Sequence, residues 1–147
     1  MPTAAKLTGC LLFALIGAAV ALRLPVYLPQ GMKTGLLLPI TVVVAAVLGW
    51  RIAGTRSGRQ TYADGAATGV LTVAVTLLTL LFTFGLFEML RLTQRMIYKG
   101  PMEAIIGIFE QALKFAPMLL HMDLLLVMAV GGLMAGLACE AVGRRWP

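Results

Sequence analysis

The chain has 147 residues, of which 60% are hydrophobic and 12% are charged, with 12 basic residues against 6 acidic ones. So few charged side chains cannot form the polar shell of a soluble domain of this size, and lipid must replace water over much of the surface. We therefore expect an all-α, polytopic membrane protein with one membrane domain over residues 1–147.

Four stretches are long and apolar enough to cross a bilayer, which takes roughly 20 residues in a helix. The clearest runs from Gly65 to Phe87 without a charged side chain. Pro39 falls in the first turn of the second span, where its missing N–H removes no helical hydrogen bond, and Trp50 suits a membrane edge. The predicted spans cover about residues 7–24, 35–52, 63–88 and 120–142.

The N-terminal segment resembles a secretion signal in two ways. Ala19-Val20-Ala21 has the small residues of a cleavage site, and Leu7-Thr8-Gly9-Cys10 is similar to a lipoprotein box. A lipoprotein signal needs its hydrophobic region before the cysteine, and only a short segment precedes Cys10. We expect the first span to be a retained anchor.

The charges after the third span fall on one stripe of a helix. Glu88, Arg91, Arg95 and Lys99 follow each other at steps of three, four and four residues. This spacing predicts that the third helix continues beyond the membrane. Gly100-Pro101 then predicts a break, because Gly suits a helix end and Pro suits the first position of a new helix.

The new helix, expected from Pro101 to about Phe115, is amphipathic. It is too short and too polar to span a membrane, so it should lie in the interface or pack against the projecting helix. We predict that residues 89–115 form a cap on the membrane surface. The apolar side carries Met102, Ile105, Ile106, Phe109 and Leu113, and the other side carries Glu103, Glu110, Gln111 and Lys114.

Five motifs occur in order along the chain: the start MPTAAKL, Gly49-Trp50-Arg51 with residues 54–59 behind it, Phe87-Glu88-Met89-Leu90 through to Tyr98, Gly100-Pro101-Met102-Glu103-Ala104, and Arg144-Arg145-Trp146-Pro147. Together they resemble the TrgA-type tellurite-resistance proteins, which are small inner-membrane proteins of photosynthetic and related alphaproteobacteria. The resemblance implies a bacterial inner-membrane protein associated with tellurite resistance. It implies no catalytic residue and no transport mechanism.

Basic residues set the expected orientation, because Lys and Arg in short loops tend to stay in the cytoplasm. The four-span arrangement places six basic residues on each side, so the count alone decides nothing. The loop from Arg51 to Arg59 is short and free of acidic residues. On this ground we expect both termini in the cytoplasm.

Glycines four residues apart predict close helix packing. Gly65 and Gly69 open the third span, and Gly132 and Gly136 lie inside the fourth. Such pairs let helix backbones approach where no hydrophobic force drives helices together. We expect packing within the bundle; a homo-oligomer or docking to another membrane subunit is the alternative.

Few residues are suited to chemistry. His121 and Asp123 are the one metal-type pair, near Met118, Met122 and Met128, but two such ligands do not complete a metal site. We expect them to mark the membrane boundary, and we expect no metal or cofactor. Cys10 and Cys139 should lie near the same membrane face. They are a candidate thiol pair for tellurite chemistry, or else small buried apolar residues.

Charged side chains supply the remaining candidates. Glu140 has Arg144 one turn later, and we expect this pair to reach the headgroups. Arg91, Arg95 and Lys99 are candidate contacts for an anion such as tellurite or for a lipid headgroup; the alternative is a solvated helix face. The basic residues are spread over both membrane faces, so we expect no nucleic-acid partner.

The sequence contains no Walker loop, nucleophile elbow or metal-ligand cluster, which favours a non-enzymatic role. The lipid bilayer is the expected partner. Three functions are compatible with the sequence. The leading hypothesis is tellurite resistance through altered uptake or handling of the oxyanion. The alternatives are an accessory or assembly subunit of a larger respiratory or photosynthetic complex, and a channel or transporter formed by an oligomer.

Overall fold

The computed structural model describes residues 4–27, 35, 37–58, 61–93 and 101–145. Within these ranges nearly every residue is helical and no strand occurs, which confirms the predicted all-α class. Four helical segments are long and apolar enough to cross a membrane. They are Ala4–Arg23, Leu38–Arg56, Tyr62–Arg91 and Met122–Arg145. The chain is therefore a polytopic membrane protein built from helices.

The elements follow the predicted order, with the second span made of three consecutive pieces. Pro39 lies in the first turn of its first piece, as expected, and a five-residue π-helical segment, η2, joins the first piece to the third. The elements are α1 (Ala4–Tyr27), α2 (Leu37–Leu48), η2 (Gly49–Ala53), α3 (Gly54–Arg56), α4 (Tyr62–Thr93), α5 (Pro101–Leu119) and α6 (Met122–Arg145).

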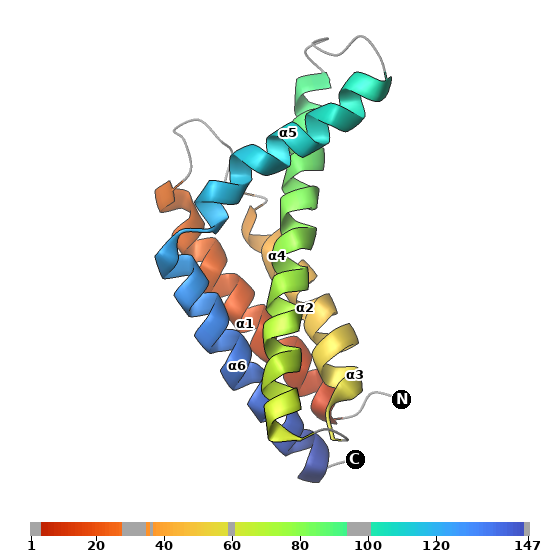
Figure 1. The fold of residues 1–147 in the computed structure, drawn as a ribbon, viewed down its shortest axis with the longest axis vertical. Helices are drawn as coiled ribbons and strands as arrows, with labels where there is room; N and C mark the ends of the chain where they lie inside the picture. The colour runs from red at the N-terminus through yellow and green to blue at the C-terminus, as the bar shows by residue number, and fades with distance from the viewer. Residues whose placement is uncertain (1–3, 28–34, 36, 59–60, 94–100, 146–147) are drawn as a thin grey trace.

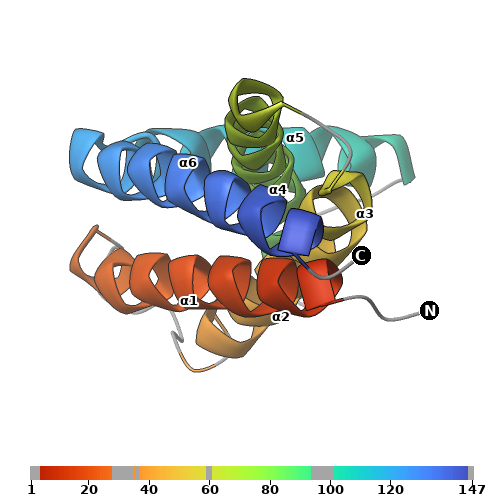
Figure 2. The ribbon, with the colours of Figure 1, turned by 90° about the horizontal axis from the view of Figure 1, so that it is seen from below.

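Successive spans run in opposite directions, so the start of α1 and the end of α6 lie at the same end of the molecule (Figure 1). Helix α1 packs against α2 and α6, and α4 packs against α6 and α5. Seen from below, α1 and α6 lie side by side and are inclined to α4, which points along the view (Figure 2). Helix α5 crosses the far half of α4 and leads back to the start of α6 (Figure 1).

Helix α4 extends well past the length that a membrane requires. Its 32 residues correspond to about 48 Å at 1.5 Å per residue, against a hydrocarbon core of about 30 Å. The predicted overshoot is therefore present as far as Thr93. Arg95, Lys99 and Gly100 lie outside the described residues.

Helix α5 begins at Pro101, as the sequence predicted, but it ends at Leu119 instead of near Phe115. Pro117 lies inside it. Proline lacks its own N–H but does not prevent helical bonds downstream, and here the Leu120 N–H donates to the Ala116 carbonyl at 2.9 Å. The helix therefore continues through the proline to the turn before α6.

Glycines bring the backbones of α4 and α6 into direct contact, in the way the sequence predicted. A Cβ atom built on Gly69 would lie 2.1 Å from the carbonyl oxygen of Gly132. A Cβ on Gly136 would lie 2.3 Å from the carbonyl oxygen of Gly65. Any side chain at these positions would push the helices apart, so the contact depends on the four glycines.

A second close contact, which no local sequence pattern indicates, joins α1 to the second span. A Cβ on Gly9 would lie 2.8 Å from the carbonyl oxygen of Gly49, and one on Gly17 would lie 2.8 Å from the Cβ of Ala45. The pairs Gly9 and Gly17, and Ala45 and Gly49, are eight and four residues apart and so share a helix face. Small residues thus set the spacing of two helix pairs.

Gly69→Ala tests whether the α4–α6 contact determines stability. Alanine improves helix propensity by about 1 kcal/mol, whereas overpacking against a backbone that cannot move costs about 1–3 kcal/mol. We expect a net loss, seen as a fall of several degrees in the thermal unfolding midpoint in detergent.

The matched control is Gly35→Ala, because a Cβ there has no neighbour within 4 Å among the residues that the structure describes. It should leave the midpoint unchanged. Equal midpoints for Gly69→Ala and Gly35→Ala would contradict the contact.

Candidate functional site

Of the charged side chains that the structure describes, only that of Glu140 is buried, and its exposed fraction is 0%. A buried ionisable group inside a membrane protein needs partners and is a candidate functional residue. Glu140 lies near the end of α6, at the end of the bundle where α1 begins. It is the natural starting point for a site.

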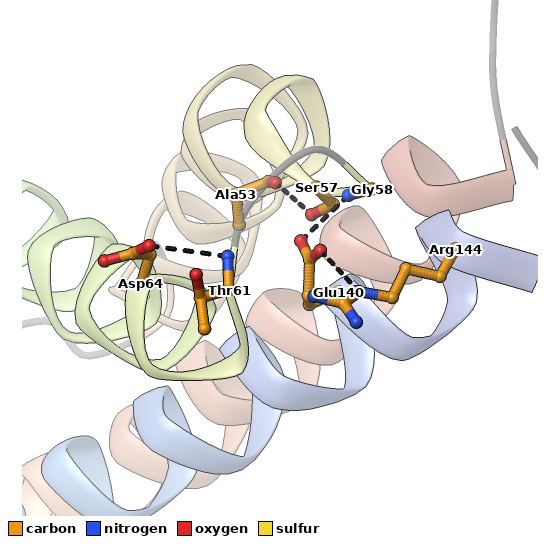
Figure 3. A network of polar contacts seen from close by, with 7 residues as sticks. All are labelled: Ala53, Ser57, Gly58, Thr61, Asp64, Glu140 and Arg144. Carbon is orange, nitrogen blue, oxygen red and sulfur yellow. Dashed lines mark hydrogen bonds and ion pairs between the residues drawn. The ribbon is translucent and has the colours of Figure 1, made fainter.

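Both carboxylate oxygens of Glu140 accept hydrogen bonds. The Gly58 backbone N–H donates to Oε2 at 2.8 Å, and Arg144 Nε donates to Oε1 at 3.0 Å (Figure 3). Arg144 also stacks on Tyr62, with its guanidinium carbon 4.2 Å from the ring centroid. We call Gly58, Tyr62, Glu140 and Arg144 the Glu140 lock, because they join the loop after α3, the start of α4 and the end of α6.

The loop can reach Glu140 because Gly58 and Gly143 bring its backbone into contact with that of α6. Gly58 has a φ of +88°, which glycine adopts readily and other residues rarely do. A Cβ on Gly58 would lie 2.7 Å from the carbonyl oxygen of Gly143, so the loop backbone rests on the last turns of α6. The Ser57 hydroxyl donates to the Ala53 carbonyl and holds the turn that leads into Gly58 (Figure 3).

The start of α4 is fixed next to the same site. The Thr61 N–H donates to the Asp64 carboxylate at 3.4 Å (Figure 3), the reach-back of an acidic residue in the first turn to the residue that caps the helix. A Cβ on Gly65 would lie 3.0 Å from the Cβ of Glu140. The glycine contact of α4 with α6 therefore continues directly into the Glu140 lock.

The hydrogen bonds of the Glu140 lock hold the loop after α3 against α6. Each carboxylate oxygen of Glu140 accepts a hydrogen bond, one from a backbone amide and the other from a guanidinium. The predicted ion pair of Glu140 with Arg144 is confirmed. The expectation that Glu140 reaches outward to the headgroups is wrong, since its side chain is buried under the Gly58 loop. Nothing local in the sequence indicates the Gly58 contact, because 82 positions separate the two residues.

The candidate anion contacts are only partly within the described chain. Arg91 forms an ion pair with Glu88, with 3.5 Å between Nη1 and Oε2, and its side chain is 43% exposed. Glu88 therefore neutralises part of the charge that Arg91 could offer an anion. Arg95 and Lys99 lie outside the described residues.

The two cysteines are free thiols and form no disulfide with each other. Cys139 lies in the hydrophobic core with Phe13 and Ala135, whereas Cys10 is half-buried on α1. Cys139 thus occupies the position of a small apolar core residue. Its burial removes it from contact with water, where an oxyanion would be dissolved.

His121 and Asp123 are exposed and lie where α6 begins. The His121 carbonyl accepts the Leu125 N–H at 2.9 Å, and Asp123 lies in the first turn, where a negative charge is favourable. Across the part of the chain that the structure describes, no three His, Cys, Asp or Glu side chains gather in a group that could hold a metal ion. His121 and Asp123 therefore contribute to the start of α6.

The interior of the bundle combines apolar side chains with four buried threonines, Thr41, Thr68, Thr72 and Thr76, among the residues that the structure describes. The hydroxyls of Thr72 and Thr76 donate to the carbonyls one turn earlier, each at 2.7 Å, and so satisfy themselves within α4. A cavity of about 20 Å³, enough for about one water molecule, lies between the four spans. Its lining consists of Phe13, Ile16, Gly17, Val20, Thr41, Ala45, Val73, Thr76, Leu80 and Met128.

Replacing Glu140 tests the lock. In Glu140→Ala the Gly58 N–H loses its acceptor, which costs about 1–3 kcal/mol. Glu140→Gln keeps one oxygen acceptor and should cost less. We expect faster trypsin cleavage after Arg56 in the order Ala, Gln, wild type, because cleavage there requires the loop to leave α6.

Glu110→Ala is the control for this series, since Glu110 is exposed on α5 and its loss should change stability by less than about 0.5 kcal/mol. Cleavage of Glu140→Ala at the wild-type rate would show that the loop is held by other contacts.

No family model, no curated protein and no solved structure matches this chain. Conclusions about its function therefore depend on its own residues and their arrangement.

Proposed function

We propose that this chain is a non-enzymatic inner-membrane protein that contributes to tellurite resistance, like the TrgA-type proteins that it resembles. Residues of the shared motifs have identifiable places in the fold. Gly49 provides the close contact with α1, Pro101 begins α5, and Arg144 belongs to the Glu140 lock. These three motif residues have roles in the fold that another side chain would not fill equally well.

The composition of the interior supports a mechanism in which one chain does not conduct the ion. Tellurite is an oxyanion with two negative charges, and its transfer through a protein requires donors or cations to replace its hydration. Every Lys and Arg that the structure describes is at least partly exposed, and the only buried charge there, Glu140, is negative. This observation carries the proposal: the protein acts as a packed helical scaffold in the membrane, and resistance follows from that role.

Two measurements on the same protein test this proposal. Purified chain in liposomes should give tellurite influx equal to that of protein-free liposomes, because no Lys or Arg is buried in the described interior to replace the hydration of the oxyanion. Expression of the chain in a tellurite-sensitive bacterium should raise the tellurite concentration that stops growth.

The two measurements can contradict different parts of the proposal. Influx several-fold above that of protein-free liposomes would contradict the scaffold role, whatever the growth result. Unchanged growth on tellurite at normal protein level would contradict the link to resistance, whatever the influx.

A second candidate function is an accessory subunit of a larger membrane complex, and the outer face of α4 favours it. Ala63, Ala67, Val70 and Ala74 are exposed there, at steps of four, three and four residues. Small side chains at this spacing suit close contact between helices, and here they point away from the bundle. Contact with another membrane protein is the activity that this face supports.

Extraction in mild detergent tests the second candidate. A stoichiometric partner should travel with the tagged chain and should be lost in Ala67→Phe, which adds bulk to the small-residue face. Val43→Phe is the control, because Val43 is exposed on α2 and outside that face. Isolation of the wild-type chain alone would contradict an accessory role.

A further inference from the structure

Helix α5 has three distinct sides, related by simple spacing. Met102, Phe109 and Leu113 belong to its apolar stripe, which also includes Ile105 and Ile106. Each of those three residues is followed by a charged residue, so the charges Glu103, Glu110 and Lys114 lie about 100° further round the helix. Positions two residues after the stripe lie about 200° round, on the side opposite to it.

The side opposite the stripe is the one that contacts the protein. Gly107, Gln111 and Phe115 are buried there, and Phe115 packs against Phe84 of α4 with the two rings tilted and their centroids 6.3 Å apart. The contact is close, since a Cβ on Gly85 of α4 would lie 2.8 Å from the Ile108 carbonyl oxygen. The sequence pattern predicts that the apolar side meets either lipid or the projecting helix. In the structure this side is mostly exposed, and Phe109 at its edge contacts α4.

The apolar stripe is therefore left on the outside of the molecule. Its five side chains are between 52% and 72% exposed. Exposed apolar surface of this extent on one helix marks a contact with lipid or with another protein. The surrounding surface decides between these two.

The stripe continues directly into the outer surface of α4. Phe109 meets Phe82 edge-to-face, with ring centroids 5.6 Å apart, and both side chains are about half exposed. Phe82 shares its face of α4 with Leu71, Leu78 and Leu86, all exposed. This face belongs to a helix of membrane-spanning length and composition, so lipid covers it. One apolar surface thus runs from the α4 span onto α5.

The position of Phe82 gives the depth of this junction. It lies six residues before Glu88, the first charge after the apolar stretch, which is about 9 Å along the helix. Interfacial helices bury their apolar side by about 5–10 Å into the boundary between headgroups and acyl chains. The middle of α5 is therefore at the depth expected for such a helix.

We propose that α5 is immersed at the acyl-chain and headgroup boundary of one leaflet, the leaflet away from the two termini. Its apolar stripe contacts acyl chains, its charged side faces the headgroups and water, and its third side holds it against α4. The protein then occupies more area in that leaflet than in the other. This inference does not depend on the proposed role in tellurite resistance.

Fluorescence quenching at two neighbouring positions tests the immersion. In a background with Cys10→Ser and Cys139→Ala, single cysteines at Leu113 and Lys114 are labelled with an environment-sensitive fluorophore. The side chains of Leu113 and Lys114 are both exposed, and Leu113 is 72% exposed. Replacing either of them by a labelled cysteine therefore leaves the packing of the bundle unchanged. The labelled chains are placed in phosphatidylcholine liposomes that contain either nitroxide-bearing acyl chains or iodide on both sides of the membrane.

We expect the nitroxide lipid to quench the label in Leu113→Cys several-fold more than the label in Lys114→Cys, and iodide to show the reverse order. Equal iodide quenching at the two positions would place the stripe in water and overturn the proposal. Protection of the label in Leu113→Cys from both quenchers would overturn it too, since a protein surface, such as a second copy of the chain, would then cover the stripe.

Discussion

The direct backbone contact between α4 and α6 is the constraint on which the rest of the structure depends. Helices in lipid gain little from apolar association, so their stability depends on how closely they approach. Gly65 and Gly69 meet Gly132 and Gly136 without intervening side chains. At this separation the loop before α4 reaches the end of α6, and Glu140 can be buried with both oxygens hydrogen-bonded. Without these partners a buried carboxylate would be strongly destabilising.

A close backbone contact made possible by glycine also occurs where α5 joins the bundle. Gly85 lets α5 approach α4 at the level of Ile108, and α5 makes the contact with the side that carries Gly107, Gln111 and Phe115. The side chains of its apolar stripe remain largely exposed. The bundle is thus closed by glycines at one end and widened by an oblique helix at the other, and no Lys or Arg is buried in its described interior.

The sequence predicted those features that depend on local pattern. Composition indicated the spans, Gly100-Pro101 indicated the start of α5, and one-turn spacing indicated the pair of Glu140 with Arg144. Features that depend on distant parts of the chain were not predictable. Gly58 meets Glu140 across 82 positions, Gly9 meets Gly49 between two spans, and the helical pattern of α5 does not indicate which side faces α4. Periodicity defines the sides of a helix but not their neighbours.

Trypsin cleavage after Arg56 in a Gly136→Ala variant tests most directly whether the α4–α6 contact positions the Glu140 lock. The new methyl group would meet the Gly65 carbonyl oxygen and force the helices apart, while every residue of the Glu140 lock stays unchanged. The account predicts cleavage several-fold faster than in the wild-type chain, because the loop loses its seat on α6. Cleavage at the wild-type rate in a variant whose thermal midpoint has fallen would show that the lock forms independently of the helix contact, and would contradict the account.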